Sequence, residues 1–502
     1  MISSPSIAAP AGEAAASGRL RAREDIRNIA VIAHVDHGKT TLVDGLLKQS
    51  RVFRDAAAAS AAGELIMDSN QLERERGITV FAKNAAIMIQ RSDDAGGPVK
   101  VNLIDTPGHA DFSSEVERTL SMADGCLLLV DAAEGPLPQT RFVLGLALQL
   151  GLRPLLVVNK VDRKDARAAE VVEEVADLFL ELATDSEQLH YPVIYAIARE
   201  GRAGDSPENL ASDLSPLFKA ILEHVPPPMV DTEAPAQLLV SALDYDPHLG
   251  RIAIGRIVRG ALTRGQSVRC INADGPTQPL KLTELYSFQG LGRQLIDRVE
   301  AGDVAALSGM PAVSIGDTIA DADTPEALPR LAITEPTVQM TISPNTGPFA
   351  GQDGKAITSR QLKERLDREL ETNVGLRVRA TTGNVGQGEG FVCAGRGELH
   401  LAILLETLRR EGLECAVSRP EVIMKRDENG KQLEPVEEVV ITVPQAHVGT
   451  VSELVGPRQA IMEHMYPDEG RGALLTATRG TATVNSRFIE YAPMGGPIPR
   501  QR

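Results

Sequence analysis

The stretch from 33 to 41, Ala-His-Val-Asp-His-Gly-Lys-Thr-Thr, lies between an apolar run at 29–32 and a helix-compatible stretch. A strand, a Gly-Lys-Thr turn and a helix in this order are typical of loops that hold a triphosphate. Lys39 would place a positive charge on the β- and γ-phosphate oxygens, and the Thr40 hydroxyl would bind Mg²⁺. Backbone N–H groups at the helix start would hold the phosphates. The residues that we expect to line this phosphate site are Asp36, His37, Gly38, Lys39, Thr40 and Thr41.

With Ala33 where the general pattern has glycine, this stretch alone could be an accidental loop, but further segments follow it. An Asp-Thr-Pro-Gly segment at 105–108 comes directly after the apolar run at 101–104. We expect Asp105 to lie at a strand end, where it contacts Mg²⁺ through water. The Gly108 amide would then sense the γ-phosphate. In isolation such a segment is usually a turn, because proline and glycine punctuate chains.

An Asn-Lys-Val-Asp segment at 159–162 follows the apolar run at 155–158 and is therefore again expected at a strand end. The Asp162 carboxylate can accept hydrogen bonds from the two N–H groups of guanine, a pair that adenine does not offer. Alone, this segment would usually be a solvated loop. In this order it predicts a guanine site, to which we assign Asn159, Lys160 and Asp162.

An Arg-Gly-Ile-Thr segment at 76–79 lies between the phosphate loop and Asp105, in a polar stretch rich in Glu and Arg. This composition is typical of a loop that orders around the γ-phosphate and is released after hydrolysis. We expect Thr79 to supply a second protein hydroxyl to Mg²⁺, beside Thr40. Four segments in this order, three of them directly after apolar runs, argue against a chance match.

His109 directly follows Gly108, where its side chain could orient the attacking water or stabilise the charge that grows during phosphoryl transfer. The alternative is a solvent-exposed histidine at the start of a helix over 110–122. We predict His109, Lys39 and Thr79 as the catalytic residues. No residue is recognisable as an arginine finger, so we expect slow turnover until a partner completes the site. Zinc is not expected, because no cysteine pair accompanies the histidines.

At these segments the sequence resembles the translational GTPases, and within them the BipA/TypA type, a ribosome-associated relative of elongation factor G and LepA. The resemblance runs from about residue 26 to the C-terminus. The distinctive stretches that carry it are 67–70, 72–79, 82–84, 135–136, 138–141, 358–361 and 418–423.

The resemblance implies that His109 is the catalytic histidine and that the sarcin-ricin loop of ribosomal RNA pushes it into place. It also implies that Val35 and Ile78 form an apolar gate beside that histidine. Where the family has Ser-Ala in the loop below guanine, this chain has Ile197 and Ala198. The Ala198 amide can still reach the guanine carbonyl, but the supporting serine hydroxyl is lost. We therefore expect somewhat weaker nucleotide binding.

Composition is that of a multidomain soluble protein. The 502 residues exceed what one hydrophobic core usually holds, and no apolar run reaches the roughly 20 residues needed to span a bilayer. The four cysteines lack metal or redox spacing, which suits a reducing cytosol. Lys plus Arg number 52 against 68 Asp plus Glu, a net charge of −16, so nucleic acid would be repelled on average and any contact with RNA must be local.

The expected fold class is multidomain α/β: a P-loop GTPase domain, then a β-barrel, then α+β ferredoxin-like domains. Short Val/Ile-rich runs between glycine turns over 236–320 predict the barrel. A strand, a helix at 359–371, two strands, a helix at 398–411 and a strand predict a ferredoxin-like sandwich. The expected parts are a disordered tail at 1–25, the GTPase domain at 26–228, the barrel at 229–328, a ferredoxin-like domain at 333–420 and an incomplete second one at 430–502.

The C-terminal part departs from the family. A strand at 438–443 and a helix at 448–465 predict the start of the second ferredoxin-like domain. Residues 468–472 then pass directly into 473–476, where the family has a further strand and the start of a helix. This suggests an internal deletion, and an incomplete sandwich would expose an apolar face. We also expect the chain to stop short of the family's additional C-terminal domain, whose basic loops contact ribosomal RNA.

We therefore predict a Mg²⁺-dependent GTP hydrolase that releases GDP and, by family resemblance, is stimulated by the bacterial ribosome. We expect a cytoplasmic monomer that binds neither DNA nor membranes. The alternative is a nucleotide-switched binding module that docks on a partner and turns over GTP negligibly. A relative acting in tRNA delivery is disfavoured, because no aminoacyl-binding signature is recognisable.

Overall fold

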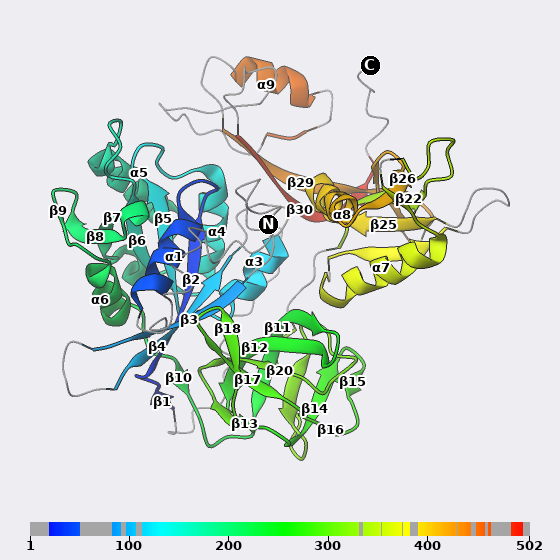
Figure 1. Cartoon of the computed structure of the whole chain (residues 1–502). Helices are drawn as coiled ribbons and strands as arrows, with labels where there is room; N and C mark the ends of the chain where they lie inside the picture. The colour runs from blue at the N-terminus through cyan, green and yellow to red at the C-terminus, as the bar shows by residue number, and fades with distance from the viewer. Residues whose placement is uncertain are drawn as a thin grey trace. The chain divides into compact units, whose positions relative to one another are not determined.

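The computed structural model of the chain divides into two compact units, Met1–Ala332 and Ile333–Arg502 (Figure 1). No helix in the described part of the chain combines the length and apolar character needed to cross a membrane. The residues that the structure describes are 20–50, 83–91, 97–106, 113–330, 335–352, 354–373, 375–381, 390–427, 429–442, 448–456, 460–462 and 483–494.

The first unit contains a sheet of eight strands in the order β3-β4-β2-β5-β6-β7-β8-β9. The strands from β4 to β7 run parallel, whereas β3 and β8 pair antiparallel with their neighbours. The strands are β2 Ile26–Ala33, β3 Lys83–Ile89, β4 Val99–Asp105, β5 Gly125–Asp131, β6 Arg153–Asn159, β7 Val193–Ile197, β8 Arg202–Ser206 and β9 Asn209–Leu210. The helices are α1 Lys39–Gln49, α3 Ser113–Leu120, α4 Pro138–Gln149, α5 Ala168–Leu182 and α6 Ser215–His224, with short 3-10 helices η3 Ser186–Leu189 and η4 Ala198–Glu200.

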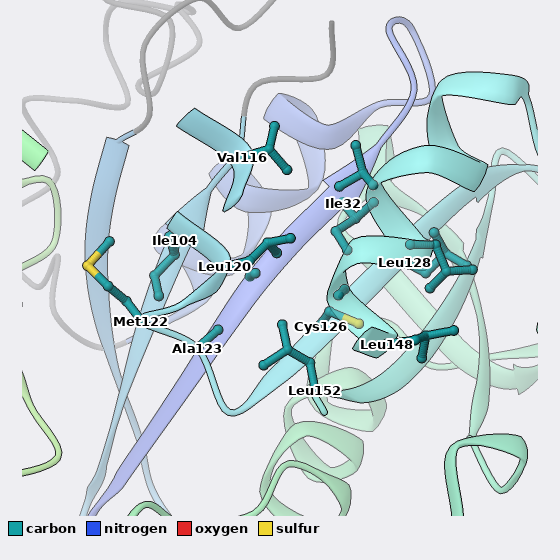
Figure 2. Packing of buried hydrophobic residues seen from close by; sticks show 14 of the residues in the cluster. Ile32, Ile104, Val116, Leu120, Met122, Ala123, Cys126, Leu128, Leu148 and Leu152 are labelled. Carbon is teal, nitrogen blue, oxygen red and sulfur yellow. The ribbon is translucent and has the colours of Figure 1, made fainter. Parts of the chain in front are cut away.

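Apolar side chains alternate between the two faces of this sheet along the central strands, as the period of a strand requires. In β2, Ala30 and Ile32 belong to one buried cluster, and Ile29 and Val31 belong to the other. The first cluster includes side chains of α3, α4 and α5, and the second includes side chains of α1 and α6. Figure 2 shows residues of the first cluster, which come from β2, β4 and β5, from helices α3 and α4, and from the loops that follow these helices. Burial on both faces explains the near-continuous apolar runs in the sequence.

The second part of the first unit is the expected β-barrel region, built on a sheet in the order β15-β14-β21-β11-β12-β20-β17-β18, with β16 also pairing with β14. Its own buried cluster contains inward-facing Val, Leu and Ile side chains. The strands are β11 Gln237–Asp246, β12 Gly250–Arg259, β13 Ala261–Thr263, β14 Ser267–Asn272, β15 Gly275–Pro276, β16 Leu280–Lys281, β17 Leu285–Gln289, β18 Gly292–Leu295, β19 Arg298–Glu300, β20 Val304–Leu307 and β21 Thr318–Asp321.

The structure differs from the expected tail at residues 21–25. Strand β1, Arg21–Ala22, pairs antiparallel with β10, Met229–Val230. The Arg23 guanidinium lies 2.8 Å from the Asp25 carboxylate and donates to the Ala301 carbonyl at 2.9 Å. The backbone pairing with β10 and the hydrogen bond to Ala301, both with partners more than two hundred positions away, hold this segment in place. Residues 1–19 lie outside the described part.

The eight-stranded sheet and the barrel region share polar contacts within the first unit. Ala86 of β3 and Gly290 exchange backbone hydrogen bonds of 2.9 and 2.7 Å. The Lys100 ammonium lies 2.7 Å from each carboxylate oxygen of Asp303, and Asn102 donates to Asp303 at 3.0 Å. These side chains are nearly buried, so the contact joins the two domains through a desolvated ion pair.

The second unit has a sheet in the order β23-β26-β22-β25-β24, with β27 also pairing with β22. The predicted strand–helix–strand–strand–helix–strand order is present, and the helices end within one residue of the expected positions. One apolar cluster joins both helices to the same side of the sheet, as in a ferredoxin-like sandwich. The elements are β22 Val338–Pro344, β23 Lys355–Ala356, α7 Ser359–Thr372, β24 Arg377–Ala380, β25 Phe391–Gly395, α8 Glu398–Arg410, β26 Leu413–Val417 and β27 Glu421–Val422.

The C-terminal part contains a three-stranded sheet and one helix. The strands β28 Lys425–Arg426, β29 Gln432–Thr442 and β30 Thr483–Pro493 pair in that order, and helix α9 spans Val448–Val455. The predicted helix over 448–465 is wrong at its end, because residues 460–462 are not helical. Gly456 followed by Pro457 stops the helix, since proline disfavours helical geometry at the preceding residue. The suspected deletion at 468–476 lies outside the described residues.

Candidate functional site

The phosphate loop connects β2, which ends at Ala33, to α1, which begins at Lys39. Two of its residues have left-handed backbone: Asp36 with φ 64° and Gly38 with φ 95°. Gly38 occupies the N-cap of α1, and its carbonyl accepts from the Leu42 amide at 2.9 Å. This geometry ends the loop on the N-terminus of a helix, where free backbone N–H groups favour a bound anion.

Lys39 and Asp105 meet below this loop. The Lys39 ammonium lies 2.9 Å from the Asp105 carboxylate and also donates to the Thr106 carbonyl. Asp105 is the last residue of β4 and is paired in register with Val31 of β2. Parallel pairing of β2 and β4 therefore brings the predicted phosphate lysine and the predicted magnesium carboxylate together. Thr40 and Thr41 are half-buried in the first turn of α1.

Asn159 joins three segments with its amide group. It is the last residue of β6; its Nδ2 donates to the His37 carbonyl at 2.9 Å, and its Oδ1 accepts from the Ala198 amide at 3.0 Å. A Cβ atom on Gly38 would lie 2.5 Å from the same Nδ2. The phosphate loop, the Asn-Lys-Val-Asp segment and the loop at Ala198 are thus held by one buried side chain.

The Asp162 carboxylate is placed at the outer end of this arrangement. It lies 3.3 Å from the guanidinium of Arg199, the residue that follows Ala198. The Arg199 side chain is 78% exposed, so solvent screens this ion pair strongly. The carboxylate can therefore exchange its arginine partner for the two N–H groups of a guanine base at modest cost. Ile197, the residue before Ala198, is buried.

His37 is fully buried, and burial lowers its pKa to about 4, below the usual 6.5. Its Nδ1 lies 3.4 Å from the Leu129 carbonyl, and its Nε2 lies 3.6 Å from the Glu134 carboxylate. The ring is neutral at pH 7, so it supplies no positive charge to a phosphate. His37 contributes to the predicted site through its backbone groups.

The structure brings most of the predicted site residues into one place, at the carboxyl ends of parallel strands. Val35 is half-buried within the loop. Four predicted residues lie outside the described part of the chain, and they are Ile78, Thr79, Gly108 and His109.

Two further residues, Asp131 and Arg199, belong to this arrangement and were not predicted from the sequence. Asp131 is the last residue of β5 and lies in register with Asn159 of β6. The signal was available, because an acidic residue follows the apolar run at 125–130 as Asp105 follows that at 101–104. Arg199, which pairs with Asp162, carried no such signal, since its position depends on how the loop after β7 folds.

Comparisons with known families agree with this geometry. The family model of the elongation factor Tu GTP binding domain matches residues 24–227. The model of elongation factor G domain 2 matches residues 235–322. The matched ranges include the phosphate loop, the segment that ends at Asp162, and the strands from β11 to β21.

Relatives match over nearly the whole chain. A Synechocystis protein named large ribosomal subunit assembly factor BipA is 48% identical over 490 residues, covering 94% of this chain and 80% of its own length. The protein of that name in Haemophilus influenzae is 48% identical over 495 residues, covering 95% and 78%. The putative elongation factor TypA-like SVR3, chloroplastic, of Arabidopsis thaliana is 46% identical over 513 residues, covering 99% and 74%.

Among solved structures, a crystal structure of a protein from Thermus thermophilus is similar with a TM-score of 0.62. It is 19% identical, and the match covers 94% of this chain and 98% of that one. At this identity the likeness concerns the fold alone.

Proposed function

Because the chain belongs to the BipA/TypA family of GTPases, we propose that it binds Mg²⁺ and GTP, hydrolyses GTP to GDP, and acts in assembly of the large ribosomal subunit. We place it in the cytoplasm as a monomer that contacts neither DNA nor a membrane. We propose that the chain consists of the GTPase domain at 26–228, the barrel at 229–328 and the ferredoxin-like parts at 333–420 and 430–502.

The observation that carries this proposal is the convergence of three separate segments on Asn159. Its amide binds the phosphate loop at His37 and the guanine-side loop at Ala198. One nucleotide could then contact the phosphate loop and the base loop together. Asp162 would accept the guanine N–H groups, and the Ala198 amide would donate to the guanine carbonyl.

The residues present fit a magnesium ion. The Asp105 carboxylate and the Thr40 hydroxyl are oxygen donors, which Mg²⁺ prefers, and both lie beside Lys39 and the start of α1. When bound, the ion would neutralise charge on the β- and γ-phosphates. Thr79 is the proposed second hydroxyl, from its place in the sequence.

The proposed hydrolytic step uses the segment after Asp105. We assign the Gly108 amide to the γ-phosphate and His109 to the attacking water, with Lys39 holding the phosphate oxygens. Val35 and Ile78 would form the apolar gate that keeps His109 away from the attacking water until a partner moves the histidine into place. These assignments follow from the order of the residues and from the family.

The proposed partner is the ribosome, in line with the names of the relatives. The net charge of −16 disfavours broad contact with RNA. Binding should therefore use local basic surfaces and weaken as salt rises.

The test is GTP turnover by the purified full chain, with and without bacterial ribosomes. We expect stimulation in the wild type and a loss of at least about a hundredfold in His109→Ala, with GDP affinity changed less than about twofold. His190→Ala, a surface histidine of the same domain, is the matched control and should behave as the wild type.

Wild-type stimulation in His109→Ala would remove this histidine from the mechanism. Ribosome binding under a GTP analogue without stimulated turnover would instead support the nucleotide-switched binding module. Failure of the wild-type chain to bind GTP would overturn the proposed function as a whole.

A further inference from the structure

Asp131 is a buried carboxylate beside the proposed nucleotide site, in contact with Lys160. It ends β5, next to β6, and its side chain has no exposed surface. The carboxyl ends of neighbouring parallel strands form the edge at which ligands bind in open α/β sheets. Asp131, like Asp105 and Asn159, is therefore the last residue of its strand at this edge, next to the loops that would contact a nucleotide.

The two carboxylate oxygens of Asp131 have different partners. Oδ1 accepts from the backbone amides of Ala133 at 2.8 Å and Glu134 at 3.3 Å. Oδ2 lies 2.8 Å from the Lys160 ammonium and 3.2 Å from the Arg163 guanidinium. One oxygen thus anchors the residue to its own loop, and the other reaches the Asn-Lys-Val-Asp segment.

The environment keeps this carboxylate charged. Burial alone raises the pKa of Asp131, but hydrogen bonds from Lys160 and the Ala133 amide outweigh burial and hold that pKa below its usual range. A buried carboxylate requires such partners, because removing one leaves an uncompensated charge away from water. The pairing with Lys160 is therefore a strong positional constraint.

Lys160 carries this constraint to the phosphate loop. Its ammonium also donates to the Asp36 carbonyl at 2.6 Å. Lys160 and Asp36 are the two non-glycine residues with positive φ in the described part of the chain, at 60° and 64°. Non-glycine residues keep a backbone with positive φ only where several surrounding contacts hold them in it. The Asp131–Lys160–Asp36 chain of contacts supplies such a restraint on both loops.

We propose that Asp131 is a positioning residue for guanine-nucleotide binding, which acts by holding Lys160 between the base loop and the phosphate loop. It does not touch the nucleotide. Through Lys160, Asp131 keeps the segment from Asn159 to Asp162 at a fixed distance from Asp36, so that the two loops can hold the base and the phosphates of one nucleotide at the same time. This inference deepens the proposed function and rests on it, since it concerns the same nucleotide site. GTP and GDP should depend on Asp131 equally, because the Asp131–Lys160–Asp36 contacts do not include Gly108, the residue that we assign to sensing of the γ-phosphate.

The test is the dissociation rate of a fluorescent GDP from the full chain carrying Asp131→Asn, Lys160→Met or both. Each single variant should release the nucleotide about tenfold faster, the size expected for loss of a hydrogen bond between charged groups. The double variant should be within about twofold of Lys160→Met, because Asp131 acts through Lys160. Effects that multiply in the double variant would indicate a merely structural carboxylate and would overturn the proposal.

The matched control is Asp165→Asn. Asp165 pairs with Arg163 at 2.8 Å and is largely exposed. Its removal should leave GDP dissociation as in the wild type. If Asp165→Asn speeds GDP dissociation as much as Asp131→Asn does, the effect of Asp131 on nucleotide binding passes through Arg163 and not through Lys160.

Asp131→Glu covers the case in which Asp131→Asn does not fold, as judged by circular dichroism. Its longer carboxylate keeps the charge but shifts Lys160, so it should speed GDP release in the wild-type background and not in Lys160→Met. An equal effect in both backgrounds would overturn the inference. If the wild type binds no GDP, the proposed function itself is overturned. If the wild type binds GDP and Asp131→Asn releases it at the wild-type rate, only this inference is overturned.

Discussion

Single polar side chains at strand ends tie the loops of this site together. Asn159 uses both ends of its amide, one for the phosphate loop and one for Ala198. Buried polar atoms are costly unless they are paired, so such a residue tolerates little substitution. Asp162 differs, because its carboxylate faces outward and has a replaceable partner in Arg199. Asn159 therefore holds the loops of the site in place, and Asp162 would recognise the guanine base.

Base selectivity can be tested at Asp162. Asp162→Asn presents an amide, which should favour xanthine, whose carbonyl replaces a guanine N–H group. We expect the ratio of GDP to xanthosine diphosphate affinity to fall by roughly a hundredfold, because two hydrogen bonds to a charged group are lost. Competition of the two nucleotides against a fluorescent GDP measures this ratio.

Arg199→Leu is the control for that experiment. It removes the exposed partner of Asp162 but keeps the carboxylate, so base preference should stay with guanine. Retained guanine preference in Asp162→Asn would mean that the base-pocket assignment is wrong.

Elements position these residues through parallel strand order. The pairing of β4, β2, β5, β6 and β7 places the last residues of several strands along one edge of the sheet. Helix α1 begins at that edge with Gly38 as its N-cap. The N-terminus of this helix, which favours a bound anion, and the strand ends therefore lie along a single edge of the sheet.

The join between β2 and α1 predicts a specific sensitivity at Gly38. Gly38→Ala adds a Cβ atom 2.5 Å from Asn159 Nδ2 at a residue with φ 95°. Left-handed backbone costs a non-glycine residue about 1–2 kcal/mol, and the contact must also displace Asn159. We expect GDP affinity to fall at least about tenfold and the thermal midpoint of the nucleotide-free chain to fall by several degrees.

Gly151→Ala separates these two causes. Gly151 has φ 77° but no atom within 4 Å of an added Cβ, so its substitution carries backbone strain alone. It should lower the thermal midpoint slightly and leave GDP affinity unchanged. Equal losses of affinity in the two variants would contradict the role of the Gly38–Asn159 contact.

In the larger of the two units, the nucleotide domain and the barrel share a continuous core. Ile252, Phe288 and Val304 of the barrel belong to the same buried cluster as side chains of β2 and β5. The Lys100–Asp303 ion pair lies at the same boundary. This packing favours movement of the two domains as one body, because separation would expose apolar surface and leave buried charges unpaired.

Unfolding of the full chain in urea tests this boundary. Asp303→Asn leaves the Lys100 ammonium without its carboxylate, and we expect the first unit to lose about 3 kcal/mol of stability. Glu223→Gln, which breaks the exposed Lys219–Glu223 pair, should cost less than about 0.5 kcal/mol. Lys100→Met combined with Asp303→Leu should recover part of the loss. A shift no larger than the Glu223→Gln control would show that the ion pair does not join the domains.

Local chemistry was readable from the residues. Apolar runs before Asp105 and Asn159 predicted strands, and the observed β4 and β6 include those runs. Helices α7 and α8 were likewise predicted almost to their ends, because their periodicity and caps are local. The apolar pattern predicts α9 as far as residue 465, but the helix ends at Val455, where Gly456 and Pro457 follow.

The order of the elements and the residue types at the site could be predicted from the sequence, because strand and helix periods and turn preferences act over a few neighbouring residues. The contacts of Asp131 with Lys160 and of Arg199 with Asp162, and the pairing of β1 with β10, became visible only in the folded chain. Those contacts join residues about thirty to two hundred positions apart in the chain. Their partners depend on sheet order and loop closure, which a local pattern does not encode.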